Sequence, residues 1–410
     1  MRKLLFVLAI IAIVAVSCQK ESNEVVDYTP SSESATDDYC TIRSYDEALL
    51  IAEDAVSRVD TRSVSRSVKS YEYYVAKPAT RSQADTIEVA FHLINYDNNA
   101  GYALVSADKR TTDVYMYSDV GQLSAEDFET KEGLSIFKDA AIEYFQAEIR
   151  GEMPLAIPSA TPITPIEKPD ILNLPLEYYN GDYYYCKTEQ RFISQSPMIT
   201  CYWHQAYPYN TINGVQFGNY TGCGINSIGQ IMSYYKYPPT YGTSVYDWDL
   251  MTANSSHIWA NDATNMIAQL MYDIGAFLDV TYGDDGTSTT ISESRRALLE
   301  YGYTVGNAQS FSTMNVIYEL DAGRPVWIRG ADVNNVGHAW VIDAYYGTMT
   351  TKTYYHRLSP YPIYATVRLP SVEFRSVWGD ANTPYSYTIP YDFSGQNYDV
   401  YVMLNIKPNN

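Results

Sequence analysis

The hydrophobic positions of the chain change their spacing from one segment to the next, and the first segment is a continuous apolar run. The run extends from Leu4 to Val16 and follows two basic residues. It is too short to span a bilayer comfortably and has the layout of a signal peptide, which we place at residues 1–18. The polar stretch that follows, residues 19–43, predicts a flexible tether.

Residues 44–151 have the periods of a small α+β domain. Ser44 to Glu47 has the pattern of a capping box, and apolar residues then recur at helical spacing as far as Val56. Alternating apolar positions around a turn predict paired strands, and an amphipathic pattern before Gly151 predicts a second helix. The expected elements are a helix from residue 45, a loop at 62–69, strands at 89–93, 102–106 and 114–117, and a helix at 134–149.

The next segment, residues 152–176, contains six prolines and few large apolar side chains. Proline at this density stiffens the chain and prevents helix formation, so the segment predicts an exposed linker that is a natural site of proteolytic processing. All six tryptophans lie beyond the linker. We therefore expect a larger packed domain over residues 177–410.

The most informative segment of that domain is a predicted helix that begins at Cys223. Apolar residues at positions 225, 228, 232 and 235 share one helical face, and two prolines follow the helix. A cysteine at a helix N-terminus faces unpaired N–H groups and the positive end of the macrodipole, and both favour a thiolate. A nucleophile is therefore one interpretation of Cys223. A buried structural cysteine is the commoner fate of this residue type.

A candidate base, His338, lies 115 residues after the cysteine, at the start of a strand predicted over residues 337–345. Cysteine first and histidine later is the chain order of papain-like enzymes, although a single histidine is more often structural. Gln205 lies 18 residues before Cys223. Its side-chain amide can donate to an oxyanion beside the Cys223 backbone N–H, and a simple loop hydrogen bond is the alternative.

The net charge argues against nucleic-acid binding, and the spacing of the cysteines argues against a metal site. Asp and Glu outnumber Lys and Arg by 48 to 28, and the resulting charge of −20 repels nucleic acid backbones. The five cysteines show no metal-ligand spacing, and we expect neither a metal nor another cofactor. An exported protein permits a disulfide among Cys40, Cys186 and Cys201.

The residues at the end of the apolar run indicate the localisation of the protein. Cys18 follows small residues, as in a bacterial lipobox, and we favour lipidation of Cys18 over ordinary signal cleavage nearby. We expect an exported lipoprotein of the outer membrane, the cell surface or the periplasm. The lipid is the only expected contact with the membrane.

Three ordered blocks of sequence resemble the streptopain family of cysteine peptidases, which are papain-like. Residues 203–210 resemble the family's W-x-Q-x-x-P-Y-N block, and residues 337–345 resemble its G-H-A-W-V-I-D-G-Y block. Residues 222–238 resemble the block that begins with Gly-Cys and continues with Gln-Ile-Met and Tyr-Pro. In addition, residues 100–121 resemble a strand and the following turn of the family's propeptide.

The resemblance implies a papain-like peptidase domain of α+β class, with a helical part and an antiparallel sheet. It implies a zymogen in which a small α+β propeptide domain, residues 44–151, inhibits the enzyme until proteolysis. Protein or peptide substrates follow from it as well. The implied site consists of Cys223 as nucleophile, His338 as base, Gln205 as oxyanion donor and Trp378 as a wall of the site, with Gly222, Gly224 and Gly337 leaving room for the substrate backbone.

The sequence departs from the family at two places. Val377 stands where the family has the asparagine that orients the histidine, and a valine side chain cannot accept a hydrogen bond. Residues 225–227, Ile-Asn-Ser, replace the family's Ala-Thr-Ala. A backbone carbonyl or another side chain can orient His338 instead. Two other interpretations stay open: a catalytically impaired lipoprotein that binds peptides or a host surface, and an acyl transferase of the transglutaminase type.

Overall fold

The computed structural model describes residues 41–59, 66–76, 87–130, 132–150, 159–161, 174–179, 181–283, 287–331, 337–356, 364–379, 386–389 and 399–409. The predicted signal peptide, Cys18, Cys40 and the tether as far as residue 40 lie outside these ranges. Within the described residues, no helix has both the length and the apolar character needed to cross a bilayer.

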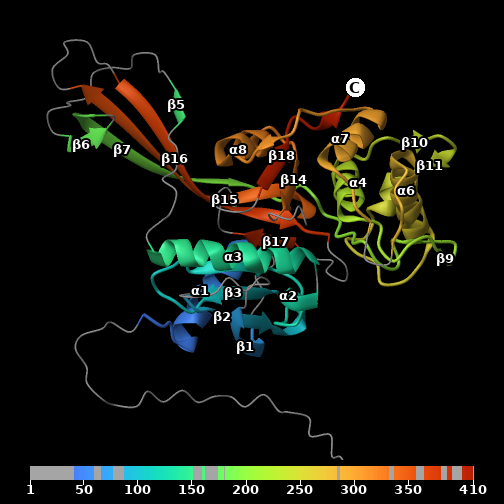
Figure 1. Cartoon of the computed structure of the whole chain (residues 1–410), viewed down its shortest axis with the longest axis horizontal. Coiled ribbons are helices and arrows are strands. Elements are labelled where there is room, and N and C mark those ends of the chain that lie inside the picture. Colours follow the sequence, from blue (N-terminus) through green and yellow to red (C-terminus); the bar gives the residue numbers. More distant parts are fainter. Residues whose placement is uncertain are drawn as a thin grey trace, which may run out of the picture. The chain divides into compact units, whose positions relative to one another are not determined.

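The N-terminal domain is a four-stranded antiparallel sheet with one helix on each face (Figure 1). Its strands are β1 (Val68–Ala76), β2 (Val89–Tyr96), β3 (Tyr102–Ser106) and β4 (Val114–Ser118), and a 3₁₀ turn, Asp97–Asn99, joins β2 to β3. Helix α1 (Tyr45–Val59) covers one face with its alanines, and α3 (Glu132–Arg150) covers the other with its phenylalanines. A short helix, α2 (Asp127–Thr130), precedes α3.

The predicted capping box is confirmed at the start of α1. The Ser44 backbone N–H donates to Glu47 Oε2 at 2.9 Å, and the Glu47 N–H donates to Ser44 Oγ at 3.3 Å. The loop predicted at 62–69 is wrong at its end, because β1 begins at Val68 and pairs with β2. β1 is an edge strand in which only Tyr74 and Ala76 are buried, so its sequence lacks the alternation that marks a half-buried strand.

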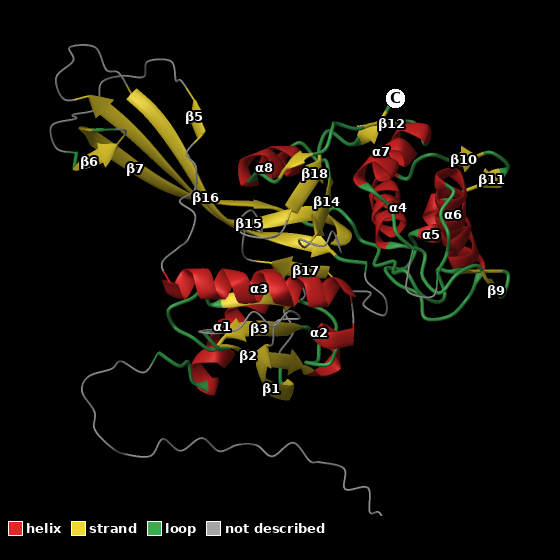
Figure 2. Cartoon of the chain, viewed as in Figure 1, coloured by secondary structure: helices red, strands yellow, loops and turns green. Residues whose placement is uncertain are grey.

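The helical part of the larger domain is the group of helices at the right of Figure 2, and its buried residues form one hydrophobic core. Its main helices are α4 (Cys223–Tyr235), α6 (Asp262–Leu278) and α7 (Ile291–Glu300), with the short α5 (Trp248–Met251). The predicted helix from Cys223 is confirmed, and Ile225, Ile228 and Met232 are buried on its inner face. Three short antiparallel strand pairs border this part: β8 (Thr211–Ile212) with β9 (Val215–Gln216), β10 (Thr240–Tyr241) with β11 (Ser244–Val245), and β12 (Tyr303–Thr304) with β19 (Lys407–Pro408).

The sheet part is antiparallel and is built around the long strand β15 (Gly337–His356). The strand order across it is β17 (Ser386–Ile389), β16 (Tyr364–Val377), β15, β14 (Val326–Ala331), β18 (Asp399–Met403) and β13 (Gln309–Ser310), with helix α8 (Thr313–Asp321) packed beside them. The far half of β15 also pairs with β7 (Asp182–Gln195), which in turn pairs with β6 (Leu176–Tyr179). The α+β class, with a helical part and an antiparallel sheet after a small α+β domain, is confirmed.

The described residues of the predicted linker are extended rather than helical. Strand β5 (Ser159–Thr161) pairs with β16, and β6 begins at Leu176. The other residues of the linker, apart from 174–175, lie outside the described ranges. The domain limits at 151 and 177 stay predictions.

The N-terminal domain and the sheet part share backbone pairing and a core. Strand β4 pairs with β17 through Tyr117 and Thr388, which joins the two sheets into one. One hydrophobic cluster contains residues of α3, β14, β15 and β16, and it also contains Trp378, which follows β16. The hydroxyl of Tyr117 also donates to the carboxylate of Glu373 on β16.

Candidate active site

Cys223 is the first residue of α4, and its side chain is neither fully buried nor fully exposed. Gly222 precedes it with a φ of 99°, and the first turn of the helix carries no acidic side chain. No acidic side chain of that turn therefore competes for the N–H groups that a helix start leaves without partners. This is the environment that the sequence predicted for a nucleophilic cysteine.

The other two described cysteines lie in different surroundings. Cys186 and Cys201 are buried free thiols, and burial raises the pKa of each. The disulfide considered among Cys40, Cys186 and Cys201 does not join the last two, and Cys40 lies outside the described residues. A buried thiol of raised pKa is chemically inert, so Cys223 is the described thiol that a reagent can reach.

The glycines beside Cys223 allow another segment of the chain to approach the helix start. A Cβ on Gly222 would lie 2.7 Å from the carbonyl oxygen of Thr287, and a Cβ on Gly224 would overlap the hydroxyl of Thr289. Likewise, a Cβ on Gly337 would lie 2.5 Å from the carbonyl oxygen of Gly330, across the β14–β15 pair. These glycines thus serve close packing within the protein, and their contact with a substrate backbone stays a prediction.

His338 is the second residue of β15 and is almost completely buried, with 1% of its surface exposed. Its Nε2 lies 2.9 Å from the backbone carbonyl oxygen of Trp378. Because a carbonyl oxygen can only accept, Nε2 carries a proton and donates it, and Nδ1 is the nitrogen whose protonation changes. The ring stacks on Trp378 with centroids 4.9 Å apart and lies 6.2 Å from the ring of Trp340.

The structure therefore shows what holds His338 in the absence of the family's asparagine. The side chain of Val377 is buried in the apolar core of the helical part. The next residue, Trp378, supplies both a flat ring and a backbone acceptor to the imidazole. The expectation that a backbone carbonyl orients the histidine agrees with this contact.

Gln205 is buried in a loop whose backbone lies next to the residues leading into α4. The Thr221 N–H donates to the Gln205 carbonyl oxygen at 2.9 Å, two residues before Cys223. Two residues before Gln205, the carbonyl oxygen of Trp203 accepts from Gln230 Nε2 at 2.7 Å and from Asn226 Nδ2 at 3.1 Å. The loop that carries Gln205 is thus fastened to the helix that carries the thiol.

The two predicted catalytic side chains come from different cores. Cys223 packs against the core of the helical part, while the partners of His338, Trp340 and Trp378, belong to the core shared with the N-terminal domain. Helix α4 itself packs against β15. Direct contact between Cys223 and His338 stays a prediction.

Sequence reasoning missed three groups of residues around the site. Asn226 and Gln230 lie one turn apart on α4 and bind the Trp203 carbonyl, but the sequence indicated only that position 226 departs from the family. His204 is buried next to Gln205, and burial lowers its pKa to about 4. The third group is the buried ion pair of Asp343 and Arg375.

A buried ion pair fixes the segment that leads to Trp203. Asp343 Oδ2 accepts from Arg375 Nη1 at 2.6 Å and from the backbone N–H groups of Ile199 and Met198 at 2.7 and 3.1 Å. Arg375 Nη2 donates to the hydroxyl of Tyr202 at 3.1 Å. The carboxylate thus ties β15 and β16 to residues 198–202, which enter the Gln205 loop.

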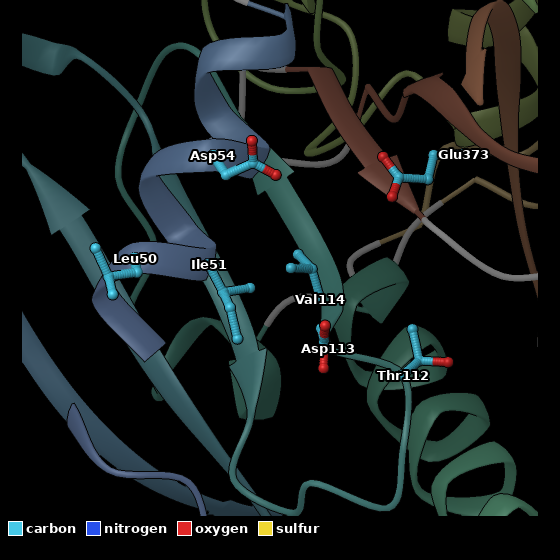
Figure 3. Close-up of a pocket in the computed structure, with 7 residues that line it drawn as sticks. All are labelled: Leu50, Ile51, Asp54, Thr112, Asp113, Val114 and Glu373. Carbon is cyan, nitrogen blue, oxygen red and sulfur yellow. The ribbon is translucent and has the colours of Figure 1, made fainter. Parts of the chain in front are cut away.

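A cavity of about 390 Å³ lies elsewhere, between α1, the start of β4 and β16 (Figure 3). Its acidic lining residues are Asp54, Asp113 and Glu373. Asp113 pairs with Arg43 at 2.6 Å, and none of the predicted site residues lines the cavity. No group of metal-ligating side chains is found among the described residues.

Comparison with known proteins gives matches to both domains. Residues 203–358 match the Peptidase C10 family, and residues 41–145 match the Spi protease inhibitor family. Streptopain of Streptococcus pyogenes is 26% identical over 286 residues, covering 63% of this chain and 68% of that protein. The thiol protease/hemagglutinin PrtT of Porphyromonas gingivalis is 25% identical over 311 residues, covering 66% of this chain and 32% of that protein. A solved fragment of prointerpain A from Prevotella intermedia covers 83% of this chain at 18% identity, with a TM-score of 0.48.

Proposed function

Because this chain belongs to the streptopain family of cysteine peptidases and carries an inhibitor-like propeptide domain, we propose that it is a zymogen whose processed form hydrolyses peptide bonds through Cys223 and His338. The observation that carries the proposal is the position of the Cys223 thiol. It is the first residue of a buried helix and stays partly exposed, whereas Cys186 and Cys201 are buried. The N–H groups that the helix start leaves without partners lie beside it.

The reaction divides into acylation and deacylation. His338 Nδ1 takes the proton of the thiol, the thiolate attacks the peptide carbonyl carbon, and His338 returns the proton to the leaving amine. Water then gives its proton to His338 and attacks the thioester, which releases the carboxylic acid product and the thiol. The Gln205 amide and the Cys223 N–H are the proposed donors to the oxyanion in both steps.

The contacts of His338 indicate the role of Trp378. The Nε2–H donates to the Trp378 carbonyl oxygen at 2.9 Å, so the imidazole cannot turn to present Nε2 to the thiol without losing this hydrogen bond. The stacked Trp378 ring covers the imidazole and excludes water from this hydrogen bond. Trp378 is therefore a positioning residue for the proposed base.

The propeptide domain is the proposed intramolecular inhibitor. Trp378 lies in a core that includes residues of α3, and His338 is 1% exposed, so a substrate cannot reach the imidazole in this state. Cleavage in the linker at residues 152–176 would release the N-terminal domain and open this core to solvent. We place the processing bond in that linker because its proline-rich sequence suits an external protease.

Export as a lipoprotein is the second part of the proposal. Its support is the apolar run of residues 4–16 followed by Cys18 after small residues. Metabolic labelling of growing cells with a fatty-acid analogue should mark the protein, and Cys18→Ala should abolish the mark. A wild-type protein that is exported without the lipid would contradict the assignment.

A rival function is binding without cleavage by a catalytically impaired relative. Val377 in place of the orienting asparagine favours it. The carbonyl of Trp378 weakens that argument, because the imidazole has an acceptor at Nε2 without a side chain at position 377.

The test uses the full chain after controlled proteolysis of the linker. The processed protein should cleave an unfolded protein substrate, and iodoacetamide should label Cys223 while Cys186 and Cys201 stay unlabelled. The uncut chain should label more slowly. Cys223→Ala is the inactive control and Cys201→Ala the control that keeps activity. Absence of both cleavage and labelling in the processed wild type would end the proposal.

A further inference from the structure

Asn226 is a buried amide one turn inside α4, and it contacts two loops of the proposed site. The side chain is 1% exposed. Its Nδ2 donates to the carbonyl oxygen of Trp203 at 3.1 Å and to that of Gly379 at 3.3 Å. Both partners can only accept, so the orientation of the amide follows from its contacts: the nitrogen faces the two loops.

The two carbonyl groups stand next to the residues that the proposed mechanism uses. Trp203 lies two residues before Gln205, in the loop of the proposed oxyanion donor. Gly379 directly follows Trp378, whose own carbonyl oxygen holds His338 Nε2 at 2.9 Å. A single side chain on the nucleophile helix thus fixes the backbone that carries the acceptor of the histidine.

The Gly379 loop is shaped for this contact. Gly379 has a φ of +61°, a conformation that L side chains rarely adopt, and a Cβ there would overlap Asn226 Nδ2. The loop therefore approaches α4 more closely than any other residue type at position 379 permits. This close approach brings the Gly379 carbonyl oxygen within hydrogen-bond distance of Asn226 Nδ2.

We propose that Asn226 is a positioning residue for His338, which it fixes through Gly379 and Trp378, and that it replaces the asparagine that the family has at position 377. The inference rests on the proposed peptidase function. Val377 supplies no polar group, while Asn226 supplies the only side-chain hydrogen bond to Gly379 that the described residues show. A threonine at 226, as in the family, is too short to donate to two carbonyl groups at once.

Gln230 provides a matched control on the same helix. It is fully buried, and its Nε2 donates to the same Trp203 carbonyl oxygen at 2.7 Å. No hydrogen bond of Gln230 to Gly379 is found among the described residues. Gln230→Met keeps the volume and removes only the link to Trp203, so it separates an effect on the Gln205 loop from an effect on His338.

The experiment measures kcat, KM and the pH profile of kcat/KM for processed wild type, Asn226→Thr, Asn226→Asp and Gln230→Met. In Asn226→Asp a carboxylate of the same shape faces two carbonyl oxygens and repels them. When the Gly379 loop loosens, the Nε2–H loses its acceptor, the imidazolium is less stable, and the pKa of His338 falls. We expect a loss of about 10- to 100-fold in kcat for both Asn226 variants, with the alkaline limit of the profile moved down by about half a pH unit or more.

Gln230→Met is expected to lose activity without moving the alkaline limit. The inference is overturned if both Asn226 variants keep the wild-type alkaline limit, or if Gln230→Met moves it equally. Asn226→Asp is isosteric and decides the question if Asn226→Thr does not fold, as judged by its thermal midpoint. The rate of Cys223 alkylation against pH, measured on the same proteins, tests the link to His338 without any peptide cleavage. Cleavage by the wild type with unmoved profiles in the variants would therefore reject this inference and leave the peptidase proposal intact.

Discussion

The thiol side and the histidine side of the site are built in different ways. Cys223 owes its position to the residues directly around it, since α4 begins there and the glycine before it has a φ of 99°, which other residue types rarely adopt. His338 owes its position to residues far away in the sequence, namely the Trp378 carbonyl and, through Gly379, Asn226. The proposed nucleophile is a local feature, and the proposed base is a tertiary one.

The difference teaches where the site is sensitive to substitution. Changes near Cys223 act on one helix start, whereas changes to any of several separated residues act on His338. The experiments below test this contrast in order of decreasing expected effect.

The largest effect is expected from removing either proposed catalytic group. His338→Ala and Cys223→Ala should each lower kcat/KM of the processed enzyme by about 10³-fold or more, because each step of the mechanism needs both. The double variant should be no worse than either single one, since the pair acts as a unit. A steady-state assay on a peptide substrate measures this. Additive losses would show that the two residues act independently, which would contradict the proposal that they form one catalytic unit.

The second effect concerns the buried ion pair on the histidine side. Asp343→Ala takes the carboxylate away from the buried Arg375 and removes the acceptor for the Met198 and Ile199 N–H groups. We expect the free energy of unfolding to fall by about 3–5 kcal/mol, measured by denaturant titration of the zymogen.

The helical part offers a control for that loss. Asp249 pairs with Lys236 at 2.5 Å, but both side chains are exposed. Asp249→Ala should therefore leave the midpoint of denaturant unfolding nearly unchanged. Equal losses in the two variants would show that burial does not set the strength of these pairs.

The third effect is a dependence of stability on pH that originates beside the Gln205 loop. Burial lowers the pKa of His204 to about 4 in the folded state, while in the unfolded state the same side chain binds a proton near pH 6.5. Between these two pH values the imidazole of His204 is neutral in the folded protein. Between these values the unfolded state holds more protons, and stability falls as the pH falls. Relative to His204→Gln, the wild type should lose up to roughly 3 kcal/mol of unfolding free energy from pH 7 to pH 4. Parallel stability curves for the two proteins would contradict this.

The smallest effect is expected when the family's asparagine is restored. Val377→Asn should leave kcat/KM within about threefold of wild type, because the Nε2–H of His338 already has an acceptor. Stability should fall by about 1–2 kcal/mol, since the new amide is buried in an apolar core. A tenfold gain in activity would show that the carbonyl of Trp378 is a poor substitute and would narrow the difference between this chain and its relatives.

Much of the fold was predictable because its signals are local. The α1 capping box, strands β2 to β4 and helices α3 and α4 follow from period and capping residues, all of which act within one or two turns. β1 was missed in part because an exposed edge strand has no apolar alternation. The pairing of β4 with β17, and the core shared by the two domains, link residues more than 200 positions apart and leave no periodic trace in the sequence.

The sequence by itself determined that a cysteine begins a helix, that a histidine begins a strand, and that Val377 cannot orient it. Only the tertiary structure decided what holds the histidine, because Asn226, His338 and Trp378 meet through packing between a helix and a sheet. Every residue type has a backbone carbonyl, so a hydrogen bond to one depends on the path of the chain and not on the residue at that position. The sequence therefore cannot predict such hydrogen bonds.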